Sequence, residues 1–231
     1  MTERGMIFNG EMVRAILDGR KTQTRRIMKV QPQPSKSRQG DFWFSSKKLE
    51  SMVHVSDLAP GNSPIADCHL FFQEHCCPFG TVGDRIWVRE TWAEAGAGAP
   101  DLKLYRANYP AHVPSHYENV PPAEDIRWTP SIHMPRWASR ILLEITDVRV
   151  ERLNSISEED CWAEGIEAVD GLFENTEIID MALKIGCCFE DSKPMFALLW
   201  QSIYGADSWQ ANPWVWVVEF KRIEGDDHAT D

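Results

Sequence analysis

The chain has 231 residues, a formal net charge of −11 and 43% hydrophobic residues, including ten tryptophans, which is enough apolar material for a substantial core. No stretch approaches the roughly 20 apolar residues of a membrane-spanning helix, and the N-terminus lacks the apolar segment and cleavage site of a secretory signal. These features predict a cytoplasmic protein with no membrane partner.

The negative charge is unevenly distributed along the chain. Residues 1–30 contain seven Lys and Arg against three Asp and Glu, whereas residues 153–231 contain four against seventeen. A basic face on an acidic body can bind phosphate locally. It is poorly suited to long duplexes, whose binding depends on neutralising many phosphates. The distribution therefore favours recognition of one nucleotide or a short strand.

The N-terminal elements follow each other closely. Residues 6–8 predict a strand, and the next segment predicts a helix with Asn9 as its N-cap and Gly19 just after its end. The Thr-rich alternation of residues 20–28 predicts a second strand. Residues 30–63 are rich in Gln, Pro, Ser, Lys and Gly and predict a long surface loop.

The rest of the chain alternates between strands and helices. Half of the 14 prolines lie in residues 95–135, which predicts an irregular excursion. Strands are predicted at residues 84–89, 140–153 and 214–223, and helices after Ser157, at 177–185 and from Pro194 to Gly205. We expect a mixed α/β (α+β) fold built around a small barrel.

Five motifs occur in order along the chain. They are GRKTQTRR (19–26), GDRIWVRETW (83–92), HMPRWASR (133–140), the segment 157–165 and WQANPWVW (209–216). Together they resemble the ASCH domain family of the PUA-like superfamily, in its phage and prophage branch. The resemblance implies one PUA-like β-barrel domain over residues 1–224 with flanking helices, long loop insertions at about 30–80 and 95–135, and a flexible acidic tail at 225–231.

The resemblance also implies a cleft for RNA or a modified nucleoside. Small members of the family hydrolyse N4-acetylcytidine, and their catalytic residues match Lys21, Thr24 and Glu164 here. In that role Lys21 would act as base, Thr24 would attack the amide carbonyl and Glu164 would pass the proton on. On a regular strand, however, Lys21 and Thr24 face opposite sides, so a bend is required. The alternative is a solvated lysine and an ordinary helix carboxylate.

Further polar and aromatic residues are candidates for binding nucleic acid. Arginines can grip phosphates in bidentate fashion, and aromatic rings can stack on bases. The candidates are Arg20, Arg25, Arg26, Arg89, Trp92, Arg136, Trp137, Arg140, Trp209 and Asn212. The alternatives are ion pairing with the surplus carboxylates, burial of the tryptophans and a turn at Asn212.

The cysteines suggest a metal site as one interpretation. Cys68, His75, Cys76 and Cys77 lie within ten residues, and zinc takes four Cys or His ligands. No CxxC pair occurs, so inert reduced thiols are the alternative. A structural zinc is thus one hypothesis, and no cofactor is required.

Several functions are consistent with these patterns. The first is recognition of RNA or a modified nucleoside or nucleotide in the cleft, with hydrolysis of an N4-acylated cytosine nucleoside as its catalytic version. The alternatives are a noncatalytic RNA-binding module, a ribonuclease and a phage assembly protein. The chain has neither a phosphate-binding P-loop motif nor a nucleophile elbow, so the sequence gives no support to the common nucleotide and serine hydrolases.

Overall fold

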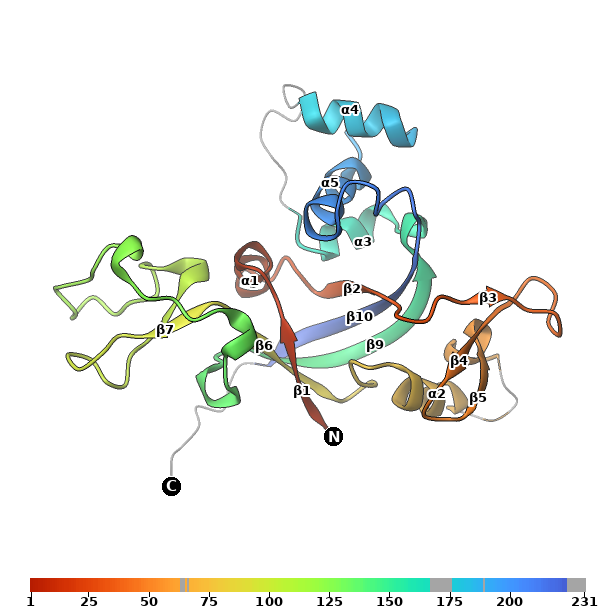
Figure 1. Ribbon diagram of the computed structural model, residues 1–231, viewed down its shortest axis with the longest axis horizontal. Coiled ribbons are helices and arrows are strands. Elements are labelled where there is room, and N and C mark those ends of the chain that lie inside the picture. The colour runs from red at the N-terminus through yellow and green to blue at the C-terminus, as the bar shows by residue number, and fades with distance from the viewer. Residues whose placement is uncertain (63–64, 66, 167–175, 189, 224–231) are drawn as a thin grey trace.

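The computed structural model of the chain describes residues 1–62, 65, 67–166, 176–188 and 190–223 (Figure 1). It shows a mixed α/β fold with a curved five-stranded sheet, two smaller sheets and helices against both faces of the main sheet. No helix in these ranges is long and apolar enough to cross a bilayer. The predicted acidic tail lies outside the described residues.

The main sheet joins strands that are far apart in the sequence. Its order is β1 (Glu3–Ile7), β6 (Arg85–Arg89), β9 (Leu142–Arg152), β10 (Trp214–Ile223) and β2 (Gln23–Ile27). Strands β1 and β6 are parallel, and the other neighbours are antiparallel. The two longest strands, β9 and β10, pair along their length with a register shift at Thr146 of β9, opposite Glu219 and Phe220, and they form the arc seen in Figure 1.

The sheet curls but is open in the described part of the chain. Strands β1 and β2 form its two edges, and no backbone ladder joins them there. A side chain bridges these edges instead: the Arg26 guanidinium donates to the Ile7 carbonyl at 2.9 Å and lies over the Phe8 ring. The predicted mixed α/β class is therefore confirmed, and in the described residues the sheet is curved without closing into a barrel.

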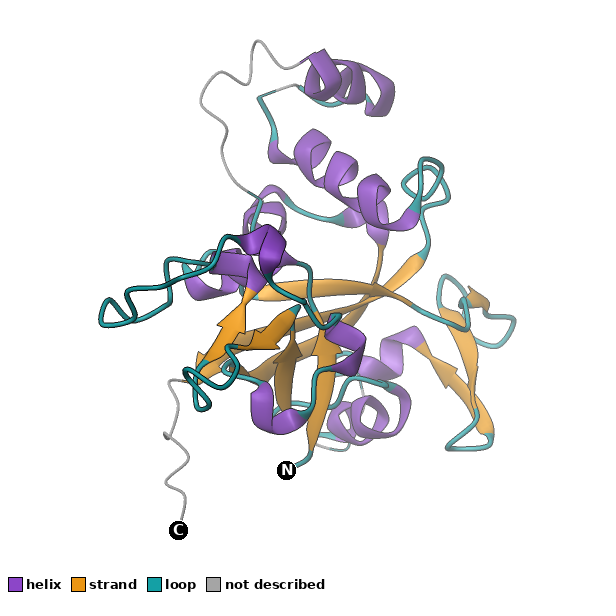
Figure 2. Cartoon of the chain, turned by 60° about the vertical axis from the view of Figure 1, so that its left-hand side comes forward, coloured by secondary structure: helices purple, strands orange, loops and turns teal. Residues whose placement is uncertain are grey.

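The predicted helices are present, with the caps that the sequence indicates. Helix α1 (Gly10–Leu17) begins after Asn9, whose side chain accepts from the Met12 amide. Helix α3 (Glu158–Ala163) begins after Ser157, whose hydroxyl accepts from the Asp160 amide. The remaining two late helices are α4 (Thr176–Ile185) and α5 (Ser192–Tyr204). These three late helices stack on one side of the sheet in both views (Figures 1 and 2).

The prediction of a loop at residues 30–63 is wrong. This segment forms a three-stranded sheet, and a helix follows it: β3 (Gln33–Pro34), β4 (Phe42–Ser46), β5 (Ser51–His54) and α2 (Cys68–Cys76). The strands are short and lie among polar turn residues, so their alternation is weak. Phe44 and Val53 nevertheless reach the main core, which is what anchors this small sheet.

The proline-rich segment, residues 95–135, is irregular, as predicted, apart from one short strand that pairs with the strand before the segment. Strand β7 (Trp92–Glu94) pairs with β8 (Lys103–Tyr105), and single turns of 3₁₀ helix follow. This segment forms the lobe around the β7 label in Figure 1.

Strand β10 separates two hydrophobic cores. Trp216 and Val218 face the core that contains α1 and the small sheet, whereas Val215 and Val217 face the core beneath α3, α4 and α5. Alternate side chains of a strand point to opposite faces of its sheet. Because β2 pairs with β10, the side chains of β2 also alternate between these two faces. This alternation determines which of them lie together in the candidate site.

Candidate functional site

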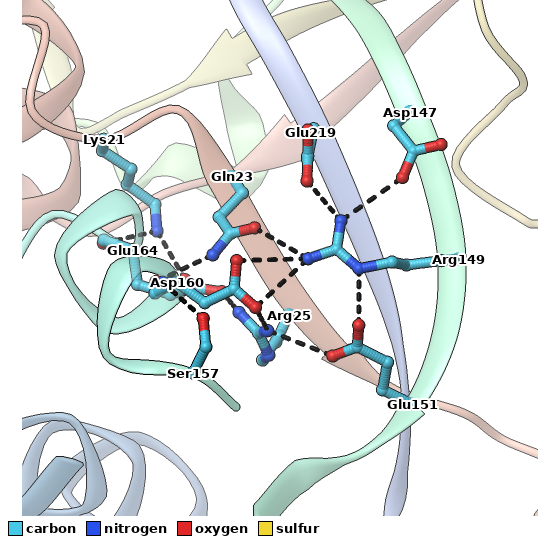
Figure 3. A network of polar contacts seen from close by, with 10 residues as sticks. All are labelled: Lys21, Gln23, Arg25, Asp147, Arg149, Glu151, Ser157, Asp160, Glu164 and Glu219. Atoms are coloured by element: carbon cyan, nitrogen blue, oxygen red, sulfur yellow. Dashed lines mark hydrogen bonds and ion pairs between the residues drawn. The ribbon is translucent and has the colours of Figure 1, made fainter. Parts of the chain in front are cut away.

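Strand β2 and the residues before it present a row of polar side chains to α3. The Lys21 ammonium reaches Glu164, the Gln23 amide donates to the Asp160 carbonyl at 2.7 Å, and the Arg25 guanidinium reaches both acidic residues. All three side chains of the row are buried. The alternation of the strand thus places Lys21, Gln23 and Arg25 on one face, beneath the helices (Figure 3).

Lys21 and Glu164 form a buried ion pair. The Lys21 Nζ lies 2.8 Å from Glu164 Oε2 and 2.8 Å from the Glu164 carbonyl oxygen, and the side chains are 0% and 4% exposed. Gly165 allows this approach because its φ is +85° and an added Cβ would lie 2.7 Å from the Lys21 Cβ. The glycine after α3 therefore lets the helix end close against Lys21.

Burial controls the charges of this pair. Desolvation lowers the pKa of the Lys21 ammonium below its ordinary value, although the Glu164 carboxylate opposes that shift. A group whose charged form is disfavoured by burial and held by one partner is typical of functional sites, and also of structural ion-pair networks. The residues around the pair distinguish a functional site from a structural ion-pair network.

Arg25 is enclosed by carboxylates. Its side chain is 0% exposed, and its guanidinium lies 2.8 Å from Asp160, 3.1 Å from Glu164 and 3.2 Å from Glu151. Burial alone would raise the pKa of Asp160, but the Arg25 charge holds it below its ordinary value. Both terminal nitrogens of Arg25 thus bind carboxylates and the side chain is fully buried, so it does not present its guanidinium to an external phosphate in this arrangement.

Arg149 on β9 extends the network across the sheet. Its guanidinium contacts Asp147, Glu151, Asp160 and Glu219. The ten side chains of Figure 3 comprise three cations, five carboxylates, one amide and one hydroxyl. The cluster therefore carries a surplus of negative charge, which disfavours phosphate at its centre.

The sequence analysis missed this part of the network, although a signal for it existed. Asp147, Arg149 and Glu151 alternate with valines in β9, and this spacing puts all three on one face. Their partners on β2 and α3 come from distant segments, which the local pattern does not identify.

Thr24 does not join the Lys21–Glu164 pair. It pairs with Val218 of β10, on the face opposite to Arg25 and its partner Val217. The register of β2 against β10 is regular, so the bend that would turn Thr24 toward Lys21 is not in β2. The Thr24 hydroxyl is buried and makes no hydrogen bond to the described residues. This geometry gives no support to Thr24 as the nucleophile.

A cavity of about 310 Å³ opens beside Glu164. Its polar lining comes from Glu11, Arg14, Arg20 and Glu164, and its apolar lining includes Met195. The Arg20 guanidinium donates to the Gly165 carbonyl at 3.0 Å, and its side chain is 34% exposed. Of the three predicted catalytic residues, Glu164 alone lines this cavity.

Two of the other predicted phosphate-binding arginines bind backbone carbonyls. Arg26 donates to Ile7, as described above, and Arg89 donates to Ser131 and Ile132. These contacts hold the β1 edge and the 130s turn in place. They give both arginines a structural role, with backbone carbonyls as partners rather than the carboxylates expected in the alternative interpretation.

Arg136 and Arg140 pair with carboxylates. Arg136 Nε lies 2.9 Å from Glu3, and Arg140 makes a bidentate pair with the buried Glu90 at 2.9 and 3.0 Å. Arg140 also lies over the Tyr105 ring at 3.9 Å. Arg136 and Arg140 therefore form the ion pairs with carboxylates that were the alternative to phosphate binding.

The aromatic candidates differ in exposure. Trp92 and Trp209 are buried, and the Asn212 side-chain oxygen accepts from a backbone amide. Trp137, in contrast, is 58% exposed, packs edge-on against Trp92, and has the Lys103 ammonium 5.6 Å from its ring centre. Only Trp137 of these four presents a ring that is available for stacking.

The cysteine and histidine candidates for zinc do not form a cluster in the described residues, where no group of three or more metal-binding side chains is found. The His75 ring hydrogen-bonds to the Phe71 carbonyl and stacks on the Phe71 ring. Burial raises the pKa of the Cys77 thiol to about 12, which favours the protonated form. A zinc site at Cys68, His75, Cys76 and Cys77 stays a prediction.

Comparison of the chain with models of protein families, with curated proteins and with solved structures gives no match. The function is therefore argued from the residues and their geometry.

Proposed function

We propose that the chain recognises a nucleoside-sized group, from RNA or a modified nucleoside, in the cavity beside Glu164. The observation that carries this proposal is the position of Glu164, which lines the cavity while its two carboxylate oxygens bind the buried Lys21 and Arg25. Ligand sites commonly combine apolar walls with a few fixed polar groups. At about 310 Å³ the cavity suits one small unit.

The chemistry of the lining favours a base that carries an exocyclic amine. A carboxylate can accept from the N4 amine of cytosine, and the exposed Glu11 lines the cavity together with Glu164. Arg20 lines the same cavity and can reach a carbonyl or phosphate. The ASCH resemblance and its PUA-like fold belong to this proposal and are consistent with a nucleoside ligand.

The test is calorimetric titration with cytidine and N4-acetylcytidine, with product analysis by chromatography. We expect binding of at least one nucleoside, and a loss of at least tenfold in affinity in Leu199→Trp, which fills the cavity. Thr24→Val is the matched control and should bind as the parent does. Equal binding by the Leu199→Trp protein, or no binding by the parent, would refute the proposal.

Hydrolysis of the acetylated nucleoside is the catalytic version of this function. We expect binding without rapid turnover, because Thr24 lies on the other face of β2. Release of cytidine that is abolished in Thr24→Val would contradict this geometry and restore the amidohydrolase mechanism.

A noncatalytic RNA-binding module is the second candidate, and Trp137 is the observation that favours it. Stacking of a base on an aromatic ring is worth about 1–3 kcal/mol. Trp137→Ala should therefore weaken binding of a short RNA by about 5- to 150-fold, whereas Trp162→Ala, at another exposed tryptophan, should not. Equal affinities for the two variants would exclude Trp137 from an RNA site.

A further inference from the structure

A second cleft lies between the end of β2, the small sheet and the residues that follow α2. Its volume is about 270 Å³. Lys29, Lys47 and Lys48 line it together with the aromatic residues Phe44 and Trp216, and no Asp or Glu of the described chain is among its lining residues. In a chain with 35 acidic residues, this is a local concentration of positive charge.

Local structure places the three lysines at the rim. Lys29 directly follows the buried Met28 at the end of β2, and Lys47 and Lys48 occupy the turn between β4 and β5. All three are exposed. Lys48 donates to the Glu74 carbonyl at 3.3 Å.

The charges of these lysines are not neutralised by the protein. Within the described ranges, none of the three lies within 4.0 Å of a carboxylate. Arg25, by contrast, has three carboxylate partners. Three cations on one cleft repel one another, so an anion that binds among them relieves this repulsion.

The walls of the cleft are apolar and largely aromatic. Phe44 and Trp216 are buried and packed edge-on at 6.3 Å, and Phe79 and His75 complete the aromatic lining. Positive grooves with aromatic side chains are the arrangement that binds single strands of nucleic acid, because the cations follow the backbone and the rings contact the bases.

We propose that this cleft binds a single-stranded nucleic acid, with one base against the partly exposed rings of His75 and Phe79 and the adjoining phosphates among Lys29, Lys47 and Lys48. The volume of about 270 Å³ admits one small group at a time. This site is separate from the Glu164 cavity and does not depend on it, nor on Trp137. The insertion at residues 30–80 thus supplies most of the residues that line this cleft.

The test measures binding of fluorescein-labelled hexamers of uridine and of deoxyuridine to the whole chain, by fluorescence anisotropy over a range of salt concentrations. The variant changes Lys29, Lys47 and Lys48 to Ala. Each lost phosphate contact lowers the slope of log K against log salt by about 0.7, so the slope should fall by about 2 and the affinity by about 50-fold at 0.15 M salt.

The matched control changes Lys184, Lys193 and Lys221 to Ala, which alters the net charge equally but lies on α4, α5 and β10. It should keep nearly the parental slope. If both triple variants lose the same affinity and salt slope, or if neither loses any, the proposal is overturned. A preference for the uridine hexamer would indicate that the 2′-hydroxyl is read, and equal affinities that the backbone is.

A second measurement locates the ligand independently of the lysines. Cys76 lines the same cleft, whereas Cys188 is exposed elsewhere. The hexamer should slow iodoacetamide modification of Cys76 severalfold, as followed by peptide mass spectrometry, and leave Cys188 unchanged. Unprotected Cys76 in the saturated complex would overturn the proposal, as would lysine-dependent binding of anionic lipid vesicles without any binding of hexamer.

Discussion

Replacing Glu164 by Gln tests whether the buried Lys21–Glu164 pair organises the site. The substitution keeps the size of the side chain and removes its charge. The Lys21 ammonium, at 0% exposure, then remains buried with only neutral partners, including the Glu164 carbonyl at 2.8 Å. Arg25 keeps Asp160 and Glu151 as partners.

Removing one partner of a buried pair costs about 3–5 kcal/mol, because an uncompensated charge stays behind. For a chain of this size each kcal/mol corresponds to about 2–4 °C in melting temperature. We therefore expect Glu164→Gln to lower the melting temperature by about 6–20 °C. Lys21→Met combined with Glu164→Gln should recover much of this loss, because no unpaired charge remains.

The assay is thermal and urea unfolding of the variants, with Glu219→Gln as the control. Glu219 belongs to the same network, but its side chain is 40% exposed, so its loss should cost less than about 1 kcal/mol. Equal destabilisation by Glu164→Gln and Glu219→Gln would refute the reasoning.

The pH dependence of the same variant gives an independent check. Burial lowers the pKa of Lys21 in the folded chain, so between that value and 10.5 the unfolded chain binds more protons and stability rises with pH. Loss of the Glu164 carboxylate lowers this pKa further. The rise of stability with pH should therefore begin at a lower pH and be larger in total in Glu164→Gln than in the parent.

Three further predictions concern the surroundings of the site. Gly165→Ala should destabilise the chain in urea by about 2 kcal/mol more than Gly186→Ala, because both have positive φ but only the first meets side chains. The folded pKa of Asp160 is lowered, so its contribution is present above about pH 4 and lost as pH falls further; Asp160→Asn should flatten the acid side of the stability profile. Cys188 is exposed and Cys77 is buried with a pKa of about 12, so a thiol reagent should modify Cys188 first in the native chain, whereas equal rates would contradict the packing.

The elements with strong local signals could be predicted from the sequence. Asn9 and Ser157 cap their helices, and β10 has the predicted boundaries, because capping and apolar alternation are local properties. The small sheet at residues 33–54 could not be predicted. Its strands are short, and their stability comes from packing against the main core rather than from their own pattern.

The site was predictable only in part. Lys21 and Glu164 are 143 positions apart, and the resemblance rather than any periodicity suggested both. The alternation rule correctly indicated that Thr24 faces away from Lys21. It could not show that Arg25 is enclosed, since its carboxylate partners come from β9 and α3.

Strand β2 also sets a length. Lys21 and Lys29 lie at its two ends, eight residues and so at most about 28 Å apart, and pairing with β10 prevents β2 from folding or stretching. The strand therefore holds the buried Lys21–Glu164 pair and the exposed Lys29, at the rim of the second cleft, at a fixed separation.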